Sequence, residues 1–181
     1  GGYNKGGRGL ATSDLITGGS QEDVRKISVI DKDGNVEFLS AYNNIPEGYK
    51  GYIDPDQYYP SHNATDFYHH WKEDIKLFAE QGYKAYRMAV SWSRILPKGD
   101  LSEINEEGLR FYDQVFDELI KYDIEPVVTL SHFDLPLYLA DERDGWKNRE
   151  TIDCFVEYSK ILFNRYQDKV KYWMTFNEIN F

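Results

Sequence analysis

The chain has little cysteine and a shortage of basic residues. Cys154 is the only cysteine among 181 residues, so no disulfide can form within this sequence, and we expect a reducing compartment, the cytoplasm. Lysine and arginine together number 21 against 31 acidic residues, which gives a formal net charge of -10. Because phosphate groups attract faces rich in Lys and Arg, this balance argues against nucleic acid or an anionic membrane as a partner.

Long apolar runs are also missing. No stretch approaches the roughly 20 apolar residues that cross a bilayer, and the start of the chain, Gly1 to Asn4, does not resemble a signal peptide. We therefore expect no membrane partner. The chain begins without methionine and stops abruptly after a strand-like run, so we expect it to be a segment of a longer protein.

The short motifs that hold metals, nucleotides or an activated serine are absent from the sequence as well. Its histidines form no His-x-x-x-His pair, which is a common arrangement of metal ligands on a helix. No Gly-x-Ser-x-Gly marks a nucleophilic serine, and no Gly-x-Gly-x-x-Gly follows a strand pattern. We expect neither a metal nor a cofactor.

The residues that are present divide the chain into two regions. Residues 1–65 are rich in Gly, Asn, Asp, Ser, Pro and Tyr, which predicts loops. One hairpin is expected there, because "KISVI" and "NVEFL" flank the turn Asp31 to Gly34. From residue 66 to residue 181 the pattern becomes regular and predicts alternating helices and strands.

The regular region predicts three helices, each followed by a strand. The first helix is expected to use Asn63 or Thr65 as its N-cap and to stop at Gly82, and the second is expected to be capped by Asn105. The third helix is expected over residues 151–166. The strands are expected over residues 85–90, 126–130 and 170–176.

Strands that alternate with helices build parallel sheets through right-handed crossovers. Two α/β architectures fit this order: a doubly wound open sheet, or part of a (β/α)8 barrel. The missing glycine motif weakens the nucleotide-binding version of the open sheet. In both architectures, ligands bind at the carboxyl ends of the strands.

Polar residues follow the expected strands at those ends. Arg87 lies within the first strand, "SHFD" (131–134) follows the second, and Asn177-Glu178 follows the third. Each has an ordinary structural explanation: Arg87 could pair with a structural carboxylate, His132 could be a core histidine, and Asn177-Glu178 could begin the next helix. A shared site is favoured because polar residues lie at the same place, the carboxyl end, of all three expected strands.

This set of residue types suits sugar chemistry. A glycosidase needs a carboxylic acid that protonates the departing oxygen and a second carboxylate that faces the anomeric carbon. Glu178 is the candidate for the first carboxyl group. The amide of Asn177 can bond a sugar hydroxyl while it orders its neighbour.

Taken together, these residues make the chain similar to the N-terminal part of family 1 glycoside hydrolases. The resemblance is carried, in this order, by "YNKGGRGLATSD", "KAYRMAVSWSRILPKG", "EPVVTLSHFDLPLYL" and "KVKYWMTFNEIN". It implies a retaining β-glycosidase on a (β/α)8 TIM barrel. The chain is then the N-terminal part of one catalytic domain over residues 1–181, and supplies roughly strands 2–4 of the barrel with their helices.

The resemblance also implies roles for individual residues. Glu178, at the end of the fourth barrel strand, matches the acid/base of the family, and Asn177 matches the residue that bonds the sugar 2-hydroxyl. His132 matches a histidine that binds the glycone, and Arg87 matches an arginine that contacts the nucleophile. Phe133 follows that histidine, where many β-glucosidases have Trp, and joins the expected substrate-binding residues.

Within the family, the bacterial 6-phospho-β-glucosidases look nearest. "GGRGLATSD" at the start, Phe133 after the histidine and Ile179-Asn180 after Glu178 resemble that branch. The expected partner is therefore a small β-glucoside, a 6-phosphorylated disaccharide, and a homo-oligomer is left open. The alternative is an unphosphorylated β-glucoside or β-galactoside.

The resemblance places several parts of the family outside this chain, namely the first strand, the nucleophile glutamate and the phosphate-binding residues. A typical barrel needs about 250 residues, so 181 residues cannot close one. We therefore expect the chain on its own to be inactive, and a non-catalytic fragment is the alternative to an enzyme.

Overall fold

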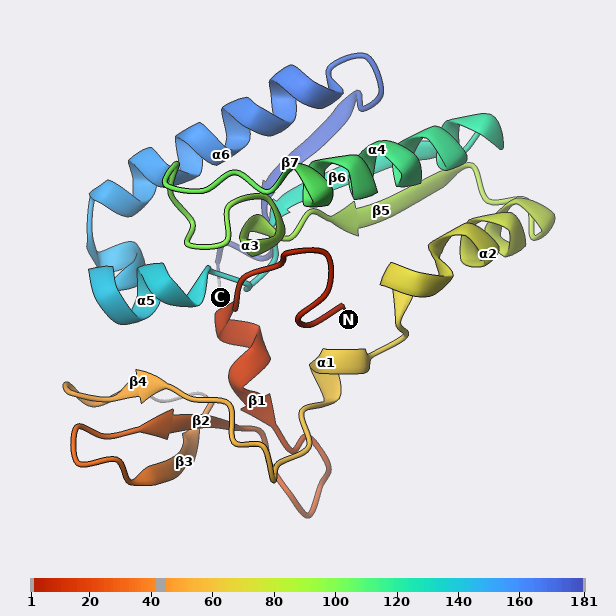
Figure 1. Cartoon of the computed structure of the whole chain (residues 1–181). Helices are drawn as coiled ribbons and strands as arrows, with labels where there is room; N and C mark the ends of the chain where they lie inside the picture. Colours follow the sequence, from red (N-terminus) through yellow and green to blue (C-terminus); the bar gives the residue numbers. More distant parts are fainter. Residues whose placement is uncertain (1, 42–44, 181) are drawn as a thin grey trace.

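The computed structural model describes residues 2–41 and 45–180, while Gly1, residues 42–44 and Phe181 lie outside the described part. A small antiparallel sheet forms one region of the molecule, and helices packed on a parallel sheet form the other (Figure 1). The elements, with η for a 3-10 helix, are η1 (Thr12–Leu15), β1 (Ile16–Thr17), β2 (Lys26–Ile30), β3 (Val36–Ser40), β4 (Lys50–Gly51), α1 (Pro60–Asn63), α2 (Phe67–Glu80), β5 (Ala85–Ala89), α3 (Trp92–Ile95), α4 (Glu106–Lys121), β6 (Glu125–Ser131), α5 (Leu137–Arg143), η2 (Gly145–Lys147), α6 (Glu150–Tyr166) and β7 (Tyr172–Phe176).

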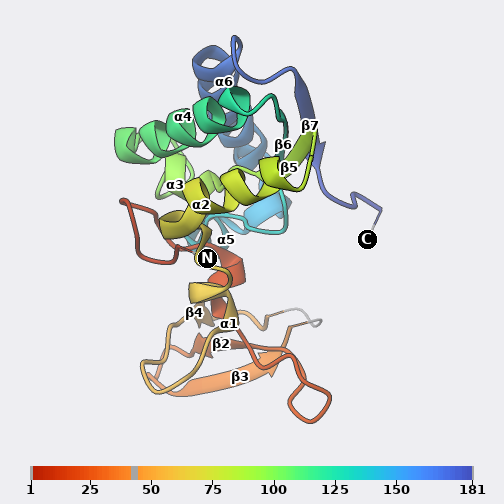
Figure 2. The same cartoon turned by 90° about the vertical axis from the view of Figure 1, so that its right-hand side faces the viewer.

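The parallel sheet has the strand order β5, β6, β7, and both pairs are parallel. Helices α4 and α6 cover one of its faces (Figures 1 and 2). Ala89 pairs with Thr129, and Thr129 pairs with Met174. Side chains alternate along a strand, so Arg87, Thr129 and Met174 share the other face of the sheet. The predicted helix–strand alternation is confirmed, with strand ends that differ from the prediction by no more than two residues.

The helices pack because their apolar residues recur every three or four positions. In α4, the side chains of Tyr112, Val115, Phe116 and Leu119 are at most 4% exposed. Burial of one such side chain contributes about 1.5–3 kcal/mol to folding. No helix in the described ranges is long and apolar enough to cross a membrane.

The helix starts show where local sequence signals were overridden. Helix α2 begins after Asp66, which has a left-handed φ of 51°, so the prediction of Asn63 or Thr65 as its N-cap was wrong; Asn63 instead ends the short helix α1. Asn105 does stand at the N-cap of α4. Its side chain accepts no cap hydrogen bond; its Nδ2 instead donates to the carbonyl oxygens of Gly6 and Arg94, at 2.7 and 2.8 Å.

The predicted hairpin is confirmed by β2 and β3, which pair antiparallel from Ile30 opposite Val36. At the turn, Asp31 Oδ1 accepts the backbone N–H groups of Asp33 and Asn35, both at 2.8 Å. The two-residue strands β1 and β4 also pair with β2, and these short additions were not expected from the sequence.

The N-terminal segment is joined to the chain that follows β6. The Thr12 N–H donates to the Leu135 carbonyl at 2.8 Å, and the Leu137 N–H donates to the Leu10 carbonyl at 2.9 Å. Ala11 and Pro136 form an isolated antiparallel bridge between these hydrogen bonds. The segment is therefore fixed next to the carboxyl end of the parallel sheet (Figure 1).

Candidate active site

Two of the predicted site residues, Arg87 and Asn177, are in contact at the carboxyl end of the sheet. Arg87 lies in β5, and its Nη2 donates to Asn177 Oδ1 at 2.7 Å. The Asn177 N–H donates to the Ser131 carbonyl at 3.0 Å, which continues the ladder between β6 and β7 by one more hydrogen bond. The backbone thus fixes Asn177 before its side chain reaches across β6 to the arginine.

The buried Thr129 of β6 holds the Arg87 guanidinium from the side. Arg87 Nε donates to Thr129 Oγ1 at 3.3 Å, and Thr129 is 1% exposed. Because Asn177 Oδ1 is occupied by Arg87, the Nδ2 of Asn177 is the side-chain donor that remains for a ligand. The hydrogen bond from Arg87 therefore orients the Asn177 amide so that Nδ2, and not Oδ1, is available to a ligand.

Glu178 follows directly and lies at a sharp bend of the backbone. Its φ is 47°, in the left-handed region that costs a non-glycine residue about 1–2 kcal/mol. Its side chain is exposed. The bend ends the extended chain after Asn177 and leaves the Glu178 carboxyl group accessible to a ligand.

His132 and Phe133 lie at the exit of the neighbouring strand β6. Both side chains are exposed, and their rings meet edge to face with centroids 5.5 Å apart. In the part of the chain that the structure describes, neither forms a hydrogen bond with Arg87, Asn177 or Glu178. The structure thus joins Arg87 to Asn177, and places His132 and Phe133 on the adjacent strand without direct contact.

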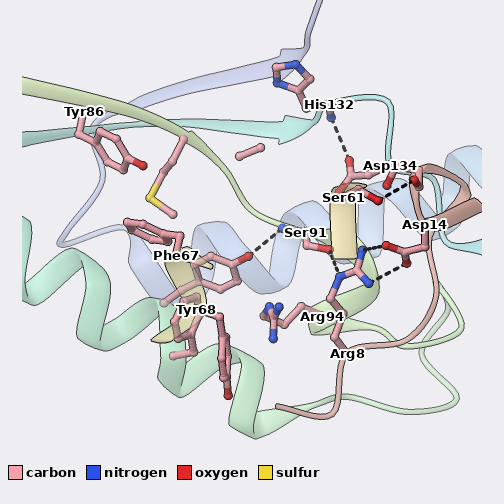
Figure 3. A pocket seen from close by; sticks show the side chains of 15 residues that line it. Arg8, Asp14, Ser61, Phe67, Tyr68, Tyr86, Ser91, Arg94, His132 and Asp134 are labelled. Carbon is pink, nitrogen blue, oxygen red and sulfur yellow. Dashed lines mark hydrogen bonds and ion pairs between the residues drawn. The ribbon is translucent and has the colours of Figure 1, made fainter. Parts of the chain in front are cut away.

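A buried ion pair next to these exits was missed from the sequence. The Arg8 guanidinium donates to both carboxylate oxygens of Asp14, at 2.7 and 3.1 Å, and its Nε donates to Ser91 Oγ at 3.3 Å (Figure 3). The side chains of Arg8 and Asp14 are 8% and 3% exposed. No local signal identifies this pair, because "GGRG" suggests only a flexible loop. The Ser91 hydroxyl, which also binds the Arg8 guanidinium, is 83 residues away in the sequence.

Asp134, two residues after His132, was also missed as a functional candidate. Its Oδ1 accepts the backbone N–H of His132 at 3.1 Å. Desolvation raises the pKa of this half-buried carboxyl to about 7, against the lowering effects of the His132 N–H and the Arg8 charge. Asp134, His132, Arg8 and Asp14 together line one part of a cavity of about 390 Å³ (Figure 3).

A metal site is not evident. Within residues 2–41 and 45–180, no group of three or more His, Cys, Asp or Glu side chains is arranged to hold a metal ion.

Comparison with known proteins identifies the group to which this site belongs. Residues 1–181 match the sequence model described as Glycosyl hydrolase family 1.

The chain belongs to glycosyl hydrolase family 1.

Individual family 1 proteins resemble the chain over a large part of its length. It is 50% identical over 180 residues to the aryl-phospho-beta-D-glucosidase BglA of Bacillus subtilis, a match that covers 99% of this chain and 33% of BglA. It is 48% identical over 117 residues to beta-glucosidase 11 of Arabidopsis thaliana, which covers 65% of this chain and 22% of that protein.

A solved structure of the family has the same fold. The rice β-glucosidase Os3BGlu6, solved in a covalent complex with Glc, matches with a TM-score of 0.71 and 31% sequence identity, over 97% of this chain and 30% of that one. The predicted fold is thereby confirmed: this is an α/β chain that corresponds to the N-terminal portion of a family 1 TIM barrel. It spans about one third of the length of the curated phospho-β-glucosidases that it matches, and 22% of the Arabidopsis protein.

Proposed function

We propose that the protein containing this family 1 chain is a retaining β-glycosidase that hydrolyses 6-phospho-β-glucosides. The observation that carries the proposal is the Asn177-Glu178 pair at the end of β7, with its amide held by Arg87 at 2.7 Å. The branch is supported by the 50% identity to a protein named aryl-phospho-beta-D-glucosidase. The covalent Glc complex of the rice relative supports a mechanism through a covalent intermediate.

In this mechanism Glu178 works twice. First, a carboxylate from the rest of the protein attacks the anomeric carbon, the bond to the leaving oxygen breaks, and the protonated Glu178 gives its proton to that oxygen. Then the ionised Glu178 takes a proton from water, and the hydroxide attacks the anomeric carbon and releases the sugar and the first carboxylate. The exposed position of Glu178 leaves it open to both the leaving group and the water.

The neighbouring residues bind and orient the sugar in this proposal. Asn177 Nδ2 is free to donate to the 2-hydroxyl oxygen, since its Oδ1 accepts from Arg87. His132 supplies a hydrogen bond to the glycone, and Phe133 supplies an apolar ring next to it. The guanidinium of Arg87 lies on the same face of the sheet and stabilises the attacking carboxylate.

The choice between phosphorylated and plain sugars is tested directly with two substrates on the full-length protein. We expect kcat/KM for an aryl 6-phospho-β-glucoside to exceed that for the same aryl β-glucoside by at least about 100-fold, because a site built to pair a phosphate leaves its own polar groups unpaired with the plain sugar. Activity confined to the plain glucoside would support the alternative, which is favoured by the 48% identity to the Arabidopsis β-glucosidase.

The 181-residue chain by itself is expected to be inactive, because in this proposal it supplies only one of the two carboxyl groups. Turnover of an activated aryl glycoside by the isolated chain, above the rate of a Glu178→Gln version of the same chain, would contradict this expectation. The cytoplasmic location and the absence of nucleic-acid, membrane and cofactor partners remain predictions.

Replacement of Arg87 by lysine tests whether the guanidinium orients Asn177. Lysine keeps the positive charge but cannot donate to Thr129 and Asn177 in the geometry of the planar fork. We expect kcat/KM of the full-length protein to fall by about 10- to 100-fold, as for a small misplacement in an active site. Arg110→Lys, at an exposed position of α4, is the matched control and should have no effect. An equal kcat/KM for the two variants would contradict a role of Arg87 in the site.

A further inference from the structure

Asp134 has no part in the mechanism above, yet it contacts the backbone of a residue that has. Its carboxyl oxygen accepts the His132 N–H at 3.1 Å. Figure 3 shows the carboxyl group against the backbone nitrogen, while the His132 imidazole points away from it. The contact therefore fixes the position of the His132 backbone, and within the described residues neither ring nitrogen forms a hydrogen bond with the protein.

The residue between them adopts an unfavourable conformation. Phe133 has a φ of 61°, in the left-handed region, and its side chain is 58% exposed. A bulky aromatic residue is uncommon there, since the conformation costs about 1–2 kcal/mol. The hydrogen bond from His132 to Asp134 closes the turn around Phe133 and so offsets this cost.

Beyond the turn, the chain is held by the N-terminal segment. The backbone hydrogen bonds of Leu10 and Thr12 join that segment to residues 135–137. The segment itself is folded around Asp14, whose carboxylate accepts the Ala11 N–H at 2.8 Å and both hydrogen bonds from Arg8. Asp134 thus lies between residues 135–137, which the N-terminal segment holds in place, and the exposed side chains of His132 and Phe133.

We propose that Asp134 is a positioning residue, which holds the turn that presents His132 and Phe133 to the sugar. That the ligand is a sugar rests on the proposed function. The role of Asp134 in holding the turn rests on the geometry alone, so an experiment can contradict either claim without the other.

Charged and titratable groups surround Asp134 on several sides: Arg8 and Asp14 from the N-terminal segment, Tyr158 from α6, and His132 itself. Because the folded-state pKa is raised to about 7, the protonated form is favoured by folding. The stabilisation is present below the ordinary pKa of an aspartate and is lost as the pH rises through about 7. Asp134→Asn should remove this component of the pH dependence of stability.

The test uses the full-length protein with Asp134→Ala and Asp134→Asn. Asparagine keeps an oxygen that can accept the His132 N–H, whereas alanine does not. Asp141→Ala is the matched control, because Asp141 also has a carboxyl pKa raised by burial and accepts a backbone N–H, that of Gly51 at 3.0 Å. Two readouts are taken: hydrogen exchange over residues 131–135, and kcat and KM on the better of the two aryl substrates.

We expect Asp134→Ala to speed hydrogen exchange over residues 131–135 by at least tenfold and to raise KM by about tenfold or more, with a smaller change in kcat. Asp134→Asn and Asp141→Ala should stay within about threefold of the wild type in both readouts. In a His132→Ala/Phe133→Ala background, where neither side chain remains to be presented, Asp134→Ala should lower kcat/KM by less than about threefold, because residues that act through one another are not additive.

Unchanged exchange in Asp134→Ala would overturn the proposal, and so would full additivity with the His132→Ala/Phe133→Ala double variant. If Asp134→Ala does not fold, Asp134→Glu takes its place, since it keeps the charge but moves the carboxyl group by one carbon. A wild-type protein inactive on both aryl glycosides would contradict the proposed function alone, and the exchange measurements would still decide whether Asp134 holds the turn.

Discussion

Glu178→Gln in the full-length protein is expected to lower kcat by about 10²- to 10⁴-fold on glycosides whose leaving group needs a proton. Glutamine has nearly the same shape but carries no proton that it can give to the departing oxygen. Activated aryl glycosides, whose leaving group departs without protonation, should lose much less activity in the bond-breaking step. Steady-state and burst kinetics on a poor and a good leaving group measure this difference.

The second half of the reaction supplies the control. Without the Glu178 carboxylate, water cannot be deprotonated, so the covalent intermediate should accumulate and give a burst of the aryl product. Azide is an anion and needs no general base, so it should restore turnover of the activated substrate in Glu178→Gln but not in the wild type. Equal losses on both leaving groups, with no rescue by azide, would count against the acid/base role.

Asp14→Ala is expected to have the largest effect on stability, because it leaves the Arg8 charge buried without its partner. Both side chains are less than 10% exposed, and among the residues that the structure describes the Arg8 guanidinium would keep one hydrogen bond, the longer one to Ser91 Oγ at 3.3 Å. The loss of one partner from such a pair costs about 3–5 kcal/mol. Denaturant unfolding of the full-length protein at constant pH measures the change.

Two further variants show whether burial is the cause. Glu142→Ala removes an exposed ion pair, that of Lys50 with Glu142, whose side chains are 57% and 44% exposed, and should cost less than about 1 kcal/mol. Arg8→Met combined with Asp14→Leu removes both charges and should recover part of the stability lost in Asp14→Ala. Equal losses in Asp14→Ala and Glu142→Ala would show that the Arg8–Asp14 pair is not desolvated.

Prediction from the sequence was most accurate where the pattern is local. The three strands and three helices were found because buried side chains recur with a period of two or of three to four residues. The start of α2 was missed because Asn63, Thr65 and Asp66 are all residue types that favour an N-cap, and the local sequence does not decide among them. Strands β1 and β4 were missed because two residues are too few to show alternation.

The site residues also divide into those that a local pattern indicates and those that only the fold brings together. Arg87, His132, Phe133, Asn177 and Glu178 were chosen because they lie in or after strands, and carboxyl ends of parallel strands meet at one edge. The contact from Arg87 to Asn177 joins residues 90 positions apart and could not be derived from spacing. Arg8, Asp14 and Asp134 were passed over because no local motif distinguishes them from other charged residues.

The sequence by itself determined the order of the three main helices and the three parallel strands, and the candidate residues, since these depend on residue types and on short, local periods. It indicated the family through the resemblance of its motifs. Only the tertiary structure decided which side chains meet. It oriented the Asn177 amide through Arg87, buried Arg8 against Asp14, and gave Asp134 a pKa of about 7 by desolvation. Those properties arise from neighbours brought together across the fold, and burial and electrostatic interactions depend on distance in space, not on distance along the chain.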